Sequence, residues 1–146
     1  MHFACAVICR QTREGMEALV VNSVSTDPRT GRKSEVQIKF PGGMQKGSEE
    51  PFNTMRREVL EETGLKVERG REVYRAPSPS DPKLIQFGYL VEIDDCSGRL
   101  RDQKPIVDGD TVLSQLRWVD LRVIRRGGLF PTHHGVFLAA LRDLYL

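Results

Sequence analysis

Short apolar runs without helical periodicity fill the N-terminal part of the chain and predict β-strands. Residues 3–9 and 17–21 are two such runs, and a polar turn separates them. Residues 35–40 alternate polar and apolar side chains, as a strand with one buried face does. The Pro-Gly-Gly sequence at 41–43 is expected to end that strand. This part of the chain is therefore predicted to form three strands joined by turns.

Residues 48–64 change to a helical period. Their apolar side chains recur at spacings of three and four residues, at Phe52, Met55, Val59 and Leu60. Pro51 suits the first turn of a helix, where its missing N–H leaves no bond unmade. Gly64 suits the left-handed position that commonly follows the last turn. The sequence therefore predicts one amphipathic helix between these two residues.

The second half of the chain predicts three further strands. Residues 67–75 and 84–93 are the longer candidates, and the proline-rich segment 76–82 between them is expected to be a surface loop. Residues 94–110 are polar and rich in turn formers, so they are predicted to be a loop. Residues 116–121 are predicted to form a short strand.

A helix is predicted at the C-terminus, with Thr132 placed to cap its first turn. Its apolar stripe has helical spacing: Val136, Phe137, Ala140, Leu141 and Leu144. Neighbouring residues on a helix point about 100° apart. We therefore expect His133 and His134 at the surface of the helix N-terminus, not in a shared catalytic or metal site. Trp118 has apolar neighbours in the sequence and is expected to be a core residue.

The composition is that of one ordinary globular domain, with 39% hydrophobic and 29% charged residues among 146. We therefore expect residues 1–146 to form a single α/β domain. Lysine and arginine total 22 against 20 aspartates and glutamates, and a net charge of +2 gives no strong attraction to nucleic acid or membranes. Arg122, Arg125 and Arg126 lack interleaved aromatic residues and are expected to be solvated.

Nothing in the sequence pattern predicts export or membrane insertion. The longest apolar run, residues 3–9, is far shorter than the roughly 18 residues of a membrane span, and no basic segment precedes it. The cysteines Cys5, Cys9 and Cys96 lack C-x-x-C spacing, which favours neither disulfides nor a zinc site. Cys5 and Cys9 share one face of a strand and are expected to be core residues. We therefore expect a cytoplasmic protein.

The central helix carries the residues that indicate chemistry. Glu58, Glu61 and Glu62 fall within one arc of about 100° on its surface. Like charges at these spacings destabilise a helix by a few tenths of a kcal/mol each, and a cation between them would remove that cost. Mg²⁺ and Mn²⁺ prefer carboxylate oxygens, and Mg²⁺ often takes further ligands from substrate phosphates. The alternative is an acidic helix face that is simply solvated.

The residues beside this face favour the metal interpretation. Gly42 and Gly43 precede the helix and allow the backbone to approach a ligand closely. Arg57 is placed to pair with Glu61 one turn later or to reach back to Glu49. These features together predict a site for phosphate chemistry.

The segment from Gly43 to Leu65 resembles a complete Nudix box, G-x5-E-x7-R-E-U-x-E-E-x-G-U, in which U is a bulky apolar residue. Every fixed position matches, at Gly43, Glu49, Arg57, Glu58, Glu61, Glu62 and Gly64. The box covers 23 of the 146 residues. The resemblance extends more weakly to residues 40–42 before the box and to the strand that contains Trp118.

The resemblance implies a Nudix fold, which is an α/β/α sandwich around a mixed β-sheet with a loop–helix–loop metal site. It also implies hydrolysis of a nucleoside diphosphate linked to another moiety, by attack of water on phosphorus. The implied cofactor is Mg²⁺, with Mn²⁺ as a substitute. The implied partner is a small nucleotide, not a membrane or a nucleic acid, and a homodimer is compatible with the sequence.

The resemblance assigns roles within the box. Glu58 and Glu62 would be the main metal ligands, Glu61 a direct or water-mediated ligand, and the carbonyl of Gly42 a backbone ligand. Glu58 or Glu61 would orient or deprotonate the attacking water, and Arg57 would hold the catalytic geometry. The box would be supported structurally by Gly43, Glu49 and Gly64.

One position departs from many family members, which supply another carboxylate from the loop before the tryptophan-bearing strand. Residues 111–118 contain no glutamate. Asp108 or Asp110 would replace that carboxylate, Gln115 would hold a water, or the base would lie entirely within the box. The sequence leaves these alternatives open.

Residues outside the box bear on the substrate. Family members that hydrolyse ADP-ribose tend to carry a proline some distance past the box, and Pro79 stands 15 residues after Gly64. The proline suggests ADP-ribose, and the sequence leaves the substrate unresolved between ADP-ribose and a nucleoside triphosphate-like molecule. Arg29 and Lys39 are candidate phosphate-binding residues. A different interpretation is a catalytically weak Nudix domain that binds a nucleotide metabolite as a sensor.

Overall fold

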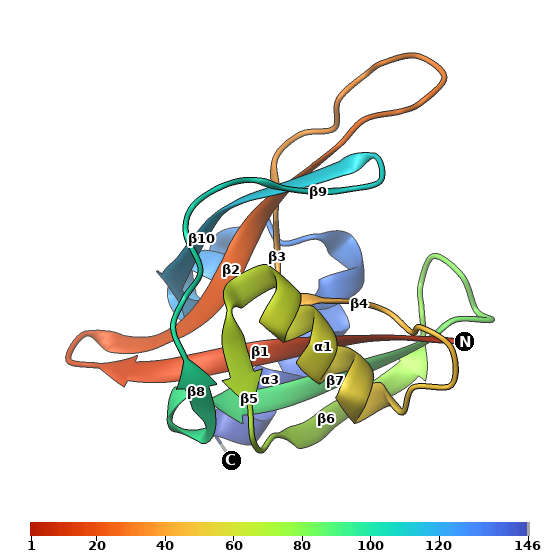
Figure 1. Cartoon of the computed structure of the whole chain (residues 1–146). Coiled ribbons are helices and arrows are strands. Elements are labelled where there is room, and N and C mark those ends of the chain that lie inside the picture. The colour runs from red at the N-terminus through yellow and green to blue at the C-terminus, as the bar shows by residue number, and fades with distance from the viewer. Residues whose placement is uncertain (146) are drawn as a thin grey trace.

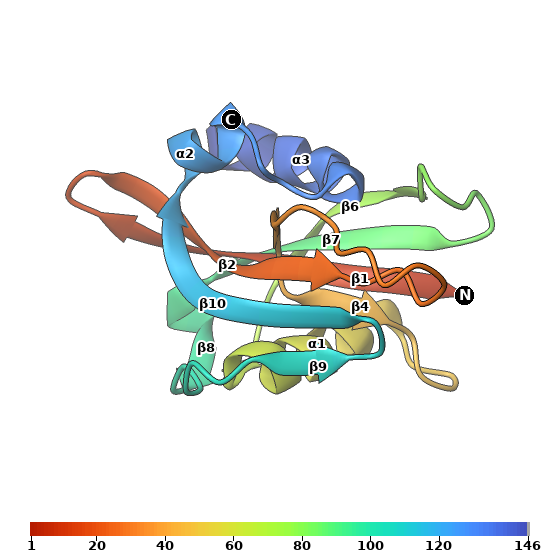
Figure 2. The same ribbon diagram turned by 90° about the horizontal axis from the view of Figure 1, so that it is seen from above.

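The computed structural model describes residues 1–145 and contains an eight-stranded mixed sheet with helices on both faces (Figure 1). The strands are β1 (His2–Thr12), β2 (Gly15–Ser25), β3 (Gln37–Lys39), β4 (Gly42–Met44), β5 (Leu65–Val67), β6 (Arg71–Pro77), β7 (Ile85–Glu92), β8 (Cys96–Gly98), β9 (Ile106–Asp108) and β10 (Thr111–Asp120). The helices are α1 (Pro51–Thr63), α2 (Leu121–Arg126) and α3 (His134–Tyr145), with 3₁₀ turns at Ile93–Asp95 and Pro131–His133. Helix α1 covers one face of the sheet, and α2 and α3 cover the other (Figure 2), which confirms the α/β/α sandwich.

Strand β1 organises the sheet. The strand order is β6-β7-β1-β2-β10-β9, with β3 paired to β2 and β4 paired to β1, while β5 and β8 form a separate ribbon. β1 runs parallel to β7 along one edge. Along its other edge it pairs antiparallel with β4 at residues 3–5 and with β2 at residues 9–12. The sheet therefore divides between β4 and β2, and this division is where the site described below lies.

Alternate side chains of β1 enter two different cores. The even-numbered residues from Ala4 to Ile8 join the core beneath α1, whereas Cys5, Val7 and Cys9 join the core beneath α3. Both cysteines are free and buried on one strand face, as predicted. Burial raises the pKa of the Cys9 thiol to about 12, so this thiol is protonated and unreactive at neutral pH.

Helix α1 begins and ends where the sequence predicts. Pro51 occupies its first turn, and Gly64 follows its last residue at φ +83°, with an N–H that donates to the carbonyl of Leu60. A β-carbon at Gly64 would overlap the carbonyl oxygen of Arg99. Glycine is thus required here both by the backbone angle and by the close approach of another segment. No helix within residues 1–145 has the length and apolar character needed to cross a lipid bilayer.

Several short strands differ from the sequence-based prediction because their partners are distant in the chain. The single strand predicted at residues 67–75 is divided into β5 and β6, which pair with different strands. The predicted loop at residues 94–110 contains β8 and β9, which pair with β5 and β10. β4 forms at residues 42–44, where the Pro-Gly-Gly sequence was expected only to end the preceding strand. Strands of three residues are too short to show a hydrophobic period.

The region predicted as a strand at residues 116–121 is a longer strand followed by a helix. β10 already begins at Thr111, and Leu121 is the first residue of α2, which was not predicted. The side chain of Asp120 accepts the N–H of Arg122 at 2.8 Å and caps this helix. A helix of six residues contains too few turns to display an apolar stripe.

His133 is buried, so the prediction of a surface position was wrong. It ends a 3₁₀ turn, and α3 begins only at His134, so Thr132 is not the N-cap of that helix. The His133 Nδ1 accepts the backbone N–H of Phe40 at 3.1 Å, and the two rings stack with centroids 5.8 Å apart. Burial, reinforced by the charge of Lys39, lowers the pKa of His133 to about 3. The imidazole therefore serves the fold as a neutral acceptor.

We expect the protein to become less stable as the pH is lowered, because of His133. The unfolded chain takes up this proton near pH 6.5 but the folded chain only near pH 3, so the contribution is complete above pH 6.5 and is lost as the pH falls toward 3. Between pH 6.5 and pH 3, protonation of this group should lower the free energy of unfolding, measured with urea, by up to about 1.4 kcal/mol for each unit by which the pH falls. His133→Asn, which keeps an acceptor for Phe40, should flatten that slope, whereas His134→Asn should not. Equal slopes in all three proteins would contradict a buried neutral imidazole.

Candidate active site

Helix α1 places its three carboxylates at different depths beside the divided sheet. Glu62 is 7% exposed, the side chain of Glu58 is 13% exposed and that of Glu61 is 50% exposed. Residues four apart lie on the same helix face, so Glu58 and Glu62 point inward together and Glu61 lies at the rim. All three line one cavity of about 180 Å³ with Asp108 of β9.

Arg57 connects these carboxylates to the loop before the helix. Its Nε and Nη2 donate to the two oxygens of Glu49 at 2.8 and 3.0 Å, which makes a bidentate pair. Its Nη1 donates to Glu58 at 2.8 Å and lies 3.4 Å from Glu61. Nη2 also donates to the carbonyl of Met44 at 2.9 Å. The sequence left open whether Arg57 pairs with Glu49 or with Glu61. Arg57 contacts both, and Glu49 is the closer partner.

Glu49 is held as a permanent anion at the start of the box loop. Besides Arg57, it accepts the N–H of Lys46 at 2.8 Å and the hydroxyl of Thr54 at 3.1 Å. The Thr54 hydroxyl is 2.8 Å from the Nε2 of His2. The hydrogen bonds from Arg57 and Lys46 lower the pKa of Glu49 to about 2. The loop is therefore fastened to α1 and to β1 at once, which is consistent with a supporting role for Glu49.

The two glycines of β4 allow close approach on both sides of the strand. A β-carbon on Gly43 would overlap the carboxyl group of Glu58, and one on Gly42 would lie 2.5 Å from the carbonyl oxygen of Ala4. The backbone of Gly42 lies close to Glu62 and acts to lower its pKa. A side chain at either glycine would displace Glu58 or separate β4 from β1.

The electrostatic environment of Glu62 favours neutralisation. Burial raises the pKa of Glu62 well above its ordinary value, and the neighbouring Glu58 raises it further. Asp108 adds a smaller effect in the same direction, while the N–H of Gly42 opposes it. Two facing carboxylates in a buried place ionise together only when a positive charge compensates them.

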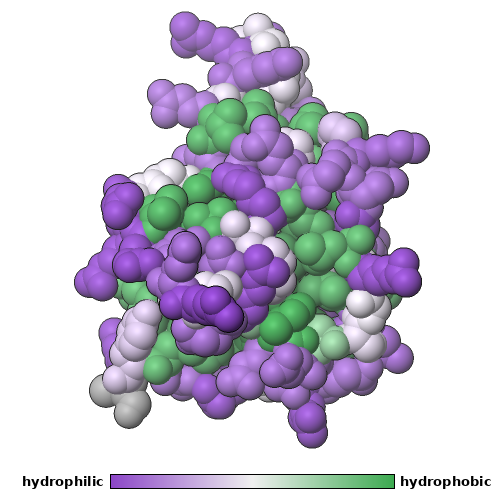
Figure 3. Space-filling model, turned by 90° about the vertical axis from the view of Figure 1, so that its left-hand side faces the viewer, coloured by the Kyte–Doolittle hydropathy of each residue, from purple (hydrophilic) through white to green (hydrophobic). Residues whose placement is uncertain are grey.

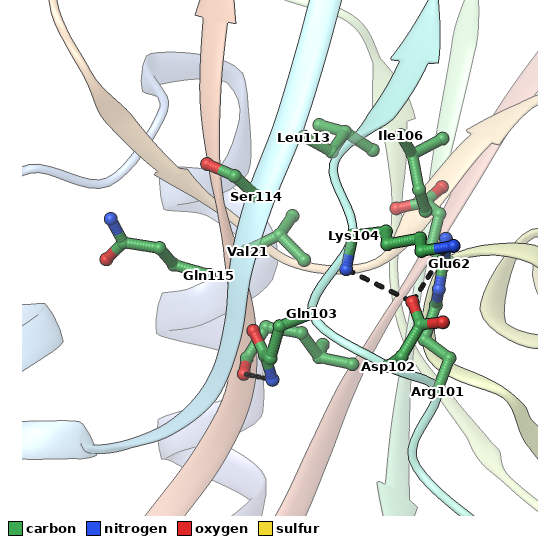
Figure 4. Close-up of a pocket in the computed structure, with 11 residues that line it drawn as sticks. Val21, Glu62, Arg101, Asp102, Gln103, Lys104, Ile106, Leu113, Ser114 and Gln115 are labelled. Carbon is green, nitrogen blue, oxygen red and sulfur yellow. Dashed lines mark hydrogen bonds and ion pairs between the residues drawn. The ribbon is translucent and has the colours of Figure 1, made fainter.

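Of the three residues that the sequence offered in place of the missing glutamate, only Asp108 lines the two larger cavities that Glu58 and Glu62 share. Asp110 is exposed in the turn after β9, where its carbonyl accepts the N–H of Thr26 at 2.8 Å. Gln115 sits in an irregularity of β10 at φ +53°. Its side chain points away from Glu62 (Figure 4), beside a hollow of only about 10 Å³.

A hairpin explains the position of Asp108. Thr111 pairs with Asp108 across β9 and β10, which leaves Gly109 and Asp110 as a two-residue turn. Gly109 has φ +58°, as such turns require. A glycine followed by aspartate is a recognised hairpin signal. This signal could have indicated that the predicted loop at residues 94–110 contains a paired strand.

The donor set fits a hard divalent cation that is completed by other ligands. Among residues 1–145, no three carboxylate, histidine or cysteine side chains already converge as a ligand set. Glu58 and Glu62 do form a facing pair whose repulsion a cation would relieve. Mg²⁺ is commonly bound by one or two carboxylates together with waters and substrate phosphates. Glu61 and Asp108 supply further oxygens on the same cavity wall.

A larger cavity of about 440 Å³ extends from the two inner glutamates. Lys39 and Lys46 stand on its wall. The Nζ of Lys39 lies 4.1 Å from the centroid of the Phe130 ring. Burial lowers the pKa of Lys39, and the charges of Glu62 and Asp108 oppose that shift. A cavity that presents both carboxylates and ammonium groups suits a phosphate chain that also binds a cation.

The other two predicted substrate residues lie outside this cavity. Arg29 is exposed in the segment that projects between β2 and β3 (Figure 1), and the tip of that projection is hydrophilic (Figure 3). Its N–H donates to the carboxylate of Asp27 at 2.8 Å. Pro79 is exposed in the loop between β6 and β7, although its neighbours Ser78 and Ser80 line a second cavity. Lys39 is thus the only one of the three on the large cavity.

The remaining candidates are not at the site. Trp118 packs against the core beneath α1 but is only half-buried, and the Arg10 guanidinium lies 4.4 Å from its ring centroid. Arg122, Arg125 and Arg126 are exposed, as expected.

Comparison with known proteins gives an independent view of the fold. A family model described as the NUDIX domain matches residues 1–140. A MutT NUDIX hydrolase from Burkholderia pseudomallei is similar in structure, with 22% identity, 95% of this chain and 94% of that chain covered, and a TM-score of 0.61. The NUDIX domain of Shewanella oneidensis NrtR, complexed with ADP ribose, has 16% identity, coverages of 100% and 88%, and a TM-score of 0.67.

A MutT protein from Methanosarcina mazei has 20% identity, coverages of 100% and 96%, and a TM-score of 0.65. A search of curated protein sequences gives no significant match. The fold and the carboxylate helix define a protein of the Nudix hydrolase type. Because the family model spans nearly the whole sequence, this chain belongs to the NUDIX domain family.

Proposed function

We propose that this protein is a Mg²⁺-dependent pyrophosphohydrolase that cleaves the diphosphate linkage of a nucleoside diphosphate derivative. The observation that carries the proposal is the pair of inward-pointing carboxylates, Glu58 and Glu62, on a cavity of about 440 Å³ that also presents Lys39 and Lys46. Such a cavity offers carboxylates for a cation and ammonium groups for phosphates. ADP-ribose and nucleoside triphosphate-like molecules are the candidate substrates.

Each residue has a part that follows from its position. Glu58 and Glu62 would hold Mg²⁺, or Mn²⁺ in its place, with Glu61, Asp108 and the carbonyl of Gly42 as further donors. When bound, the cation would neutralise charge that develops on the diphosphate oxygens. Lys39 and Lys46, which line the same cavity, would orient the phosphates. Arg57 keeps Glu58 in place and thereby fixes the geometry of the pair.

We assign the proton transfer to Glu61. Its carboxylate is half exposed and lies 3.4 Å from Arg57, whereas Glu58 is fixed by a bond of 2.8 Å. Glu61 is therefore freer to accept a proton from water. The water oxygen forms a bond to phosphorus as the bond to the bridging oxygen breaks, and two phosphate-bearing products leave.

The experiment is product release from a panel of substrates: ADP-ribose, dinucleoside polyphosphates, NADH, coenzyme A, and canonical and oxidised nucleoside triphosphates. Each is tested with Mg²⁺, with Mn²⁺ and with a chelator. We expect metal-dependent cleavage, abolished by the chelator. Cleavage that persists in the chelator would contradict the metal assignment. No cleavage, together with a rise in melting temperature on nucleotide binding, would favour the alternative of a sensor domain.

A further inference from the structure

Gln86 presents a buried side-chain amide without a hydrogen-bond partner. It is 2% exposed, and within residues 1–145 neither its Nε2 nor its Oε1 has a partner. A buried amide left unpaired is costly, so such groups in native proteins call for an explanation. Gln86 lies on β7 directly beside Phe3 of β1 in the parallel register, so both side chains extend from the same face of the sheet.

This amide belongs to the wall of a second cavity, of about 240 Å³. None of the residues that line it carries a charge. Phe3, Phe130 and Thr132 line both this cavity and the larger one that contains the helix glutamates. The two cavities therefore adjoin, and a molecule with its phosphates near Glu62 would extend into the uncharged cavity toward Gln86.

The chemistry of the second cavity suits a nucleobase. The rings of Phe3 and Phe130 offer flat apolar surfaces against which a base can pack. A glutamine amide provides one donor and one acceptor side by side, which matches the amino group and adjacent ring nitrogen of adenine. Guanine is recognised chiefly by arginine or lysine, and cytosine by a carboxylate. The uncharged lining supplies neither of these.

We propose that Gln86 selects adenine nucleotides as substrates by accepting a hydrogen bond from the adenine amino group and donating one to the neighbouring ring nitrogen. This inference rests on the proposed function for the position of the phosphates, and it assigns the base to the cavity between Phe3, Phe130 and Gln86. It makes Gln86 a specificity-determining residue.

The test is equilibrium binding of nucleoside monophosphates in the presence of Mg²⁺, by titration calorimetry. These probes contain no diphosphate linkage, so binding is measured without turnover. We expect AMP to bind about tenfold more tightly than purine riboside 5′-monophosphate, which lacks only the amino group, and more tightly than GMP or ribose 5-phosphate. The comparison uses the unmodified protein and depends on no variant.

A matched pair of variants isolates the amide. Gln86→Met keeps the length of the side chain and removes both hydrogen-bonding groups, so AMP and the purine analogue should bind equally while the melting temperature stays the same or rises. Gln11→Met makes the same change at an exposed position of β1 outside both cavities, and it should retain the preference for AMP.

Three results would overturn the inference. They are equal binding of AMP and the purine analogue by the unmodified protein, tighter binding of GMP, and an undiminished preference for AMP in Gln86→Met. The last would indicate that Gln86 is only a packing residue. Selective AMP binding without hydrolysis of any substrate would instead refute the proposed function and leave base selection standing.

Discussion

Glu62→Gln is expected to lower kcat by about 10³-fold or more while the protein becomes no less stable. The amide keeps the shape of the carboxylate but removes one of the two charges that would hold the cation, an interaction worth several kcal/mol in metal-dependent catalysis. Burial and Glu58 raise the pKa of Glu62, so the ionised side chain destabilises the folded protein when no metal is bound. Replacing it with a neutral group should maintain or increase the melting temperature without metal.

The same variant should respond less to metal. A cation that binds only the folded state raises its melting temperature, so addition of Mg²⁺ should stabilise the original protein and have a smaller effect on Glu62→Gln. Glu50→Gln is the matched control, because Glu50 precedes α1 and makes no side-chain capping bond. It should leave turnover and the Mg²⁺ response unchanged. Near-normal turnover in Glu62→Gln would refute the assignment of the metal site.

Arg57→Ala is expected to lower both activity and stability. It removes the bidentate pair with Glu49, the bond to Glu58 and the bond to the carbonyl of Met44. Loss of a residue that orients metal ligands typically reduces activity by about 10- to 100-fold. The box loop would also lose its attachment to α1, so the melting temperature should fall. Steady-state kinetics and thermal unfolding of the same preparation check the two effects.

Arg56→Ala distinguishes the site from the helix as a whole. Arg56 is the preceding residue and donates to the carbonyl of Val67 at 2.7 Å, which is a structural contact between α1 and β5. Its removal should cost stability but leave kcat close to normal. Equal losses of activity in both variants would show that Arg57 acts only through the stability of the helix.

The sequence was sufficient for features that depend on nearby residues. The helix limits at Pro51 and Gly64 follow from the preferences of single residues. The common direction of Glu58 and Glu62 follows from the helical repeat alone. Cys5, Val7 and Cys9 share one buried face of β1 because side chains alternate between the two faces of a strand.

The sequence was insufficient where contacts join distant segments. Asp108 reaches the carboxylate cavity because β9 pairs with β10, and a strand of three residues carries no periodic signal. His133 is buried because Phe40, 93 residues earlier, requires an acceptor for its N–H. Gln86 has apolar neighbours in the sequence, and only the structure shows that its amide is buried without a hydrogen-bond partner.

The sequence by itself determined the family and the carboxylate helix, and it predicted metal-dependent phosphate chemistry, because a helix converts the spacing of the box residues directly into geometry. Only the tertiary structure showed that Asp108 shares a cavity with the helix glutamates, that Lys46 joins Lys39 on the larger cavity, and that Gln86 lines an adjoining one. These placements depend on how strands far apart in the chain pair on each side of the division between β4 and β2, and no local pattern encodes that pairing.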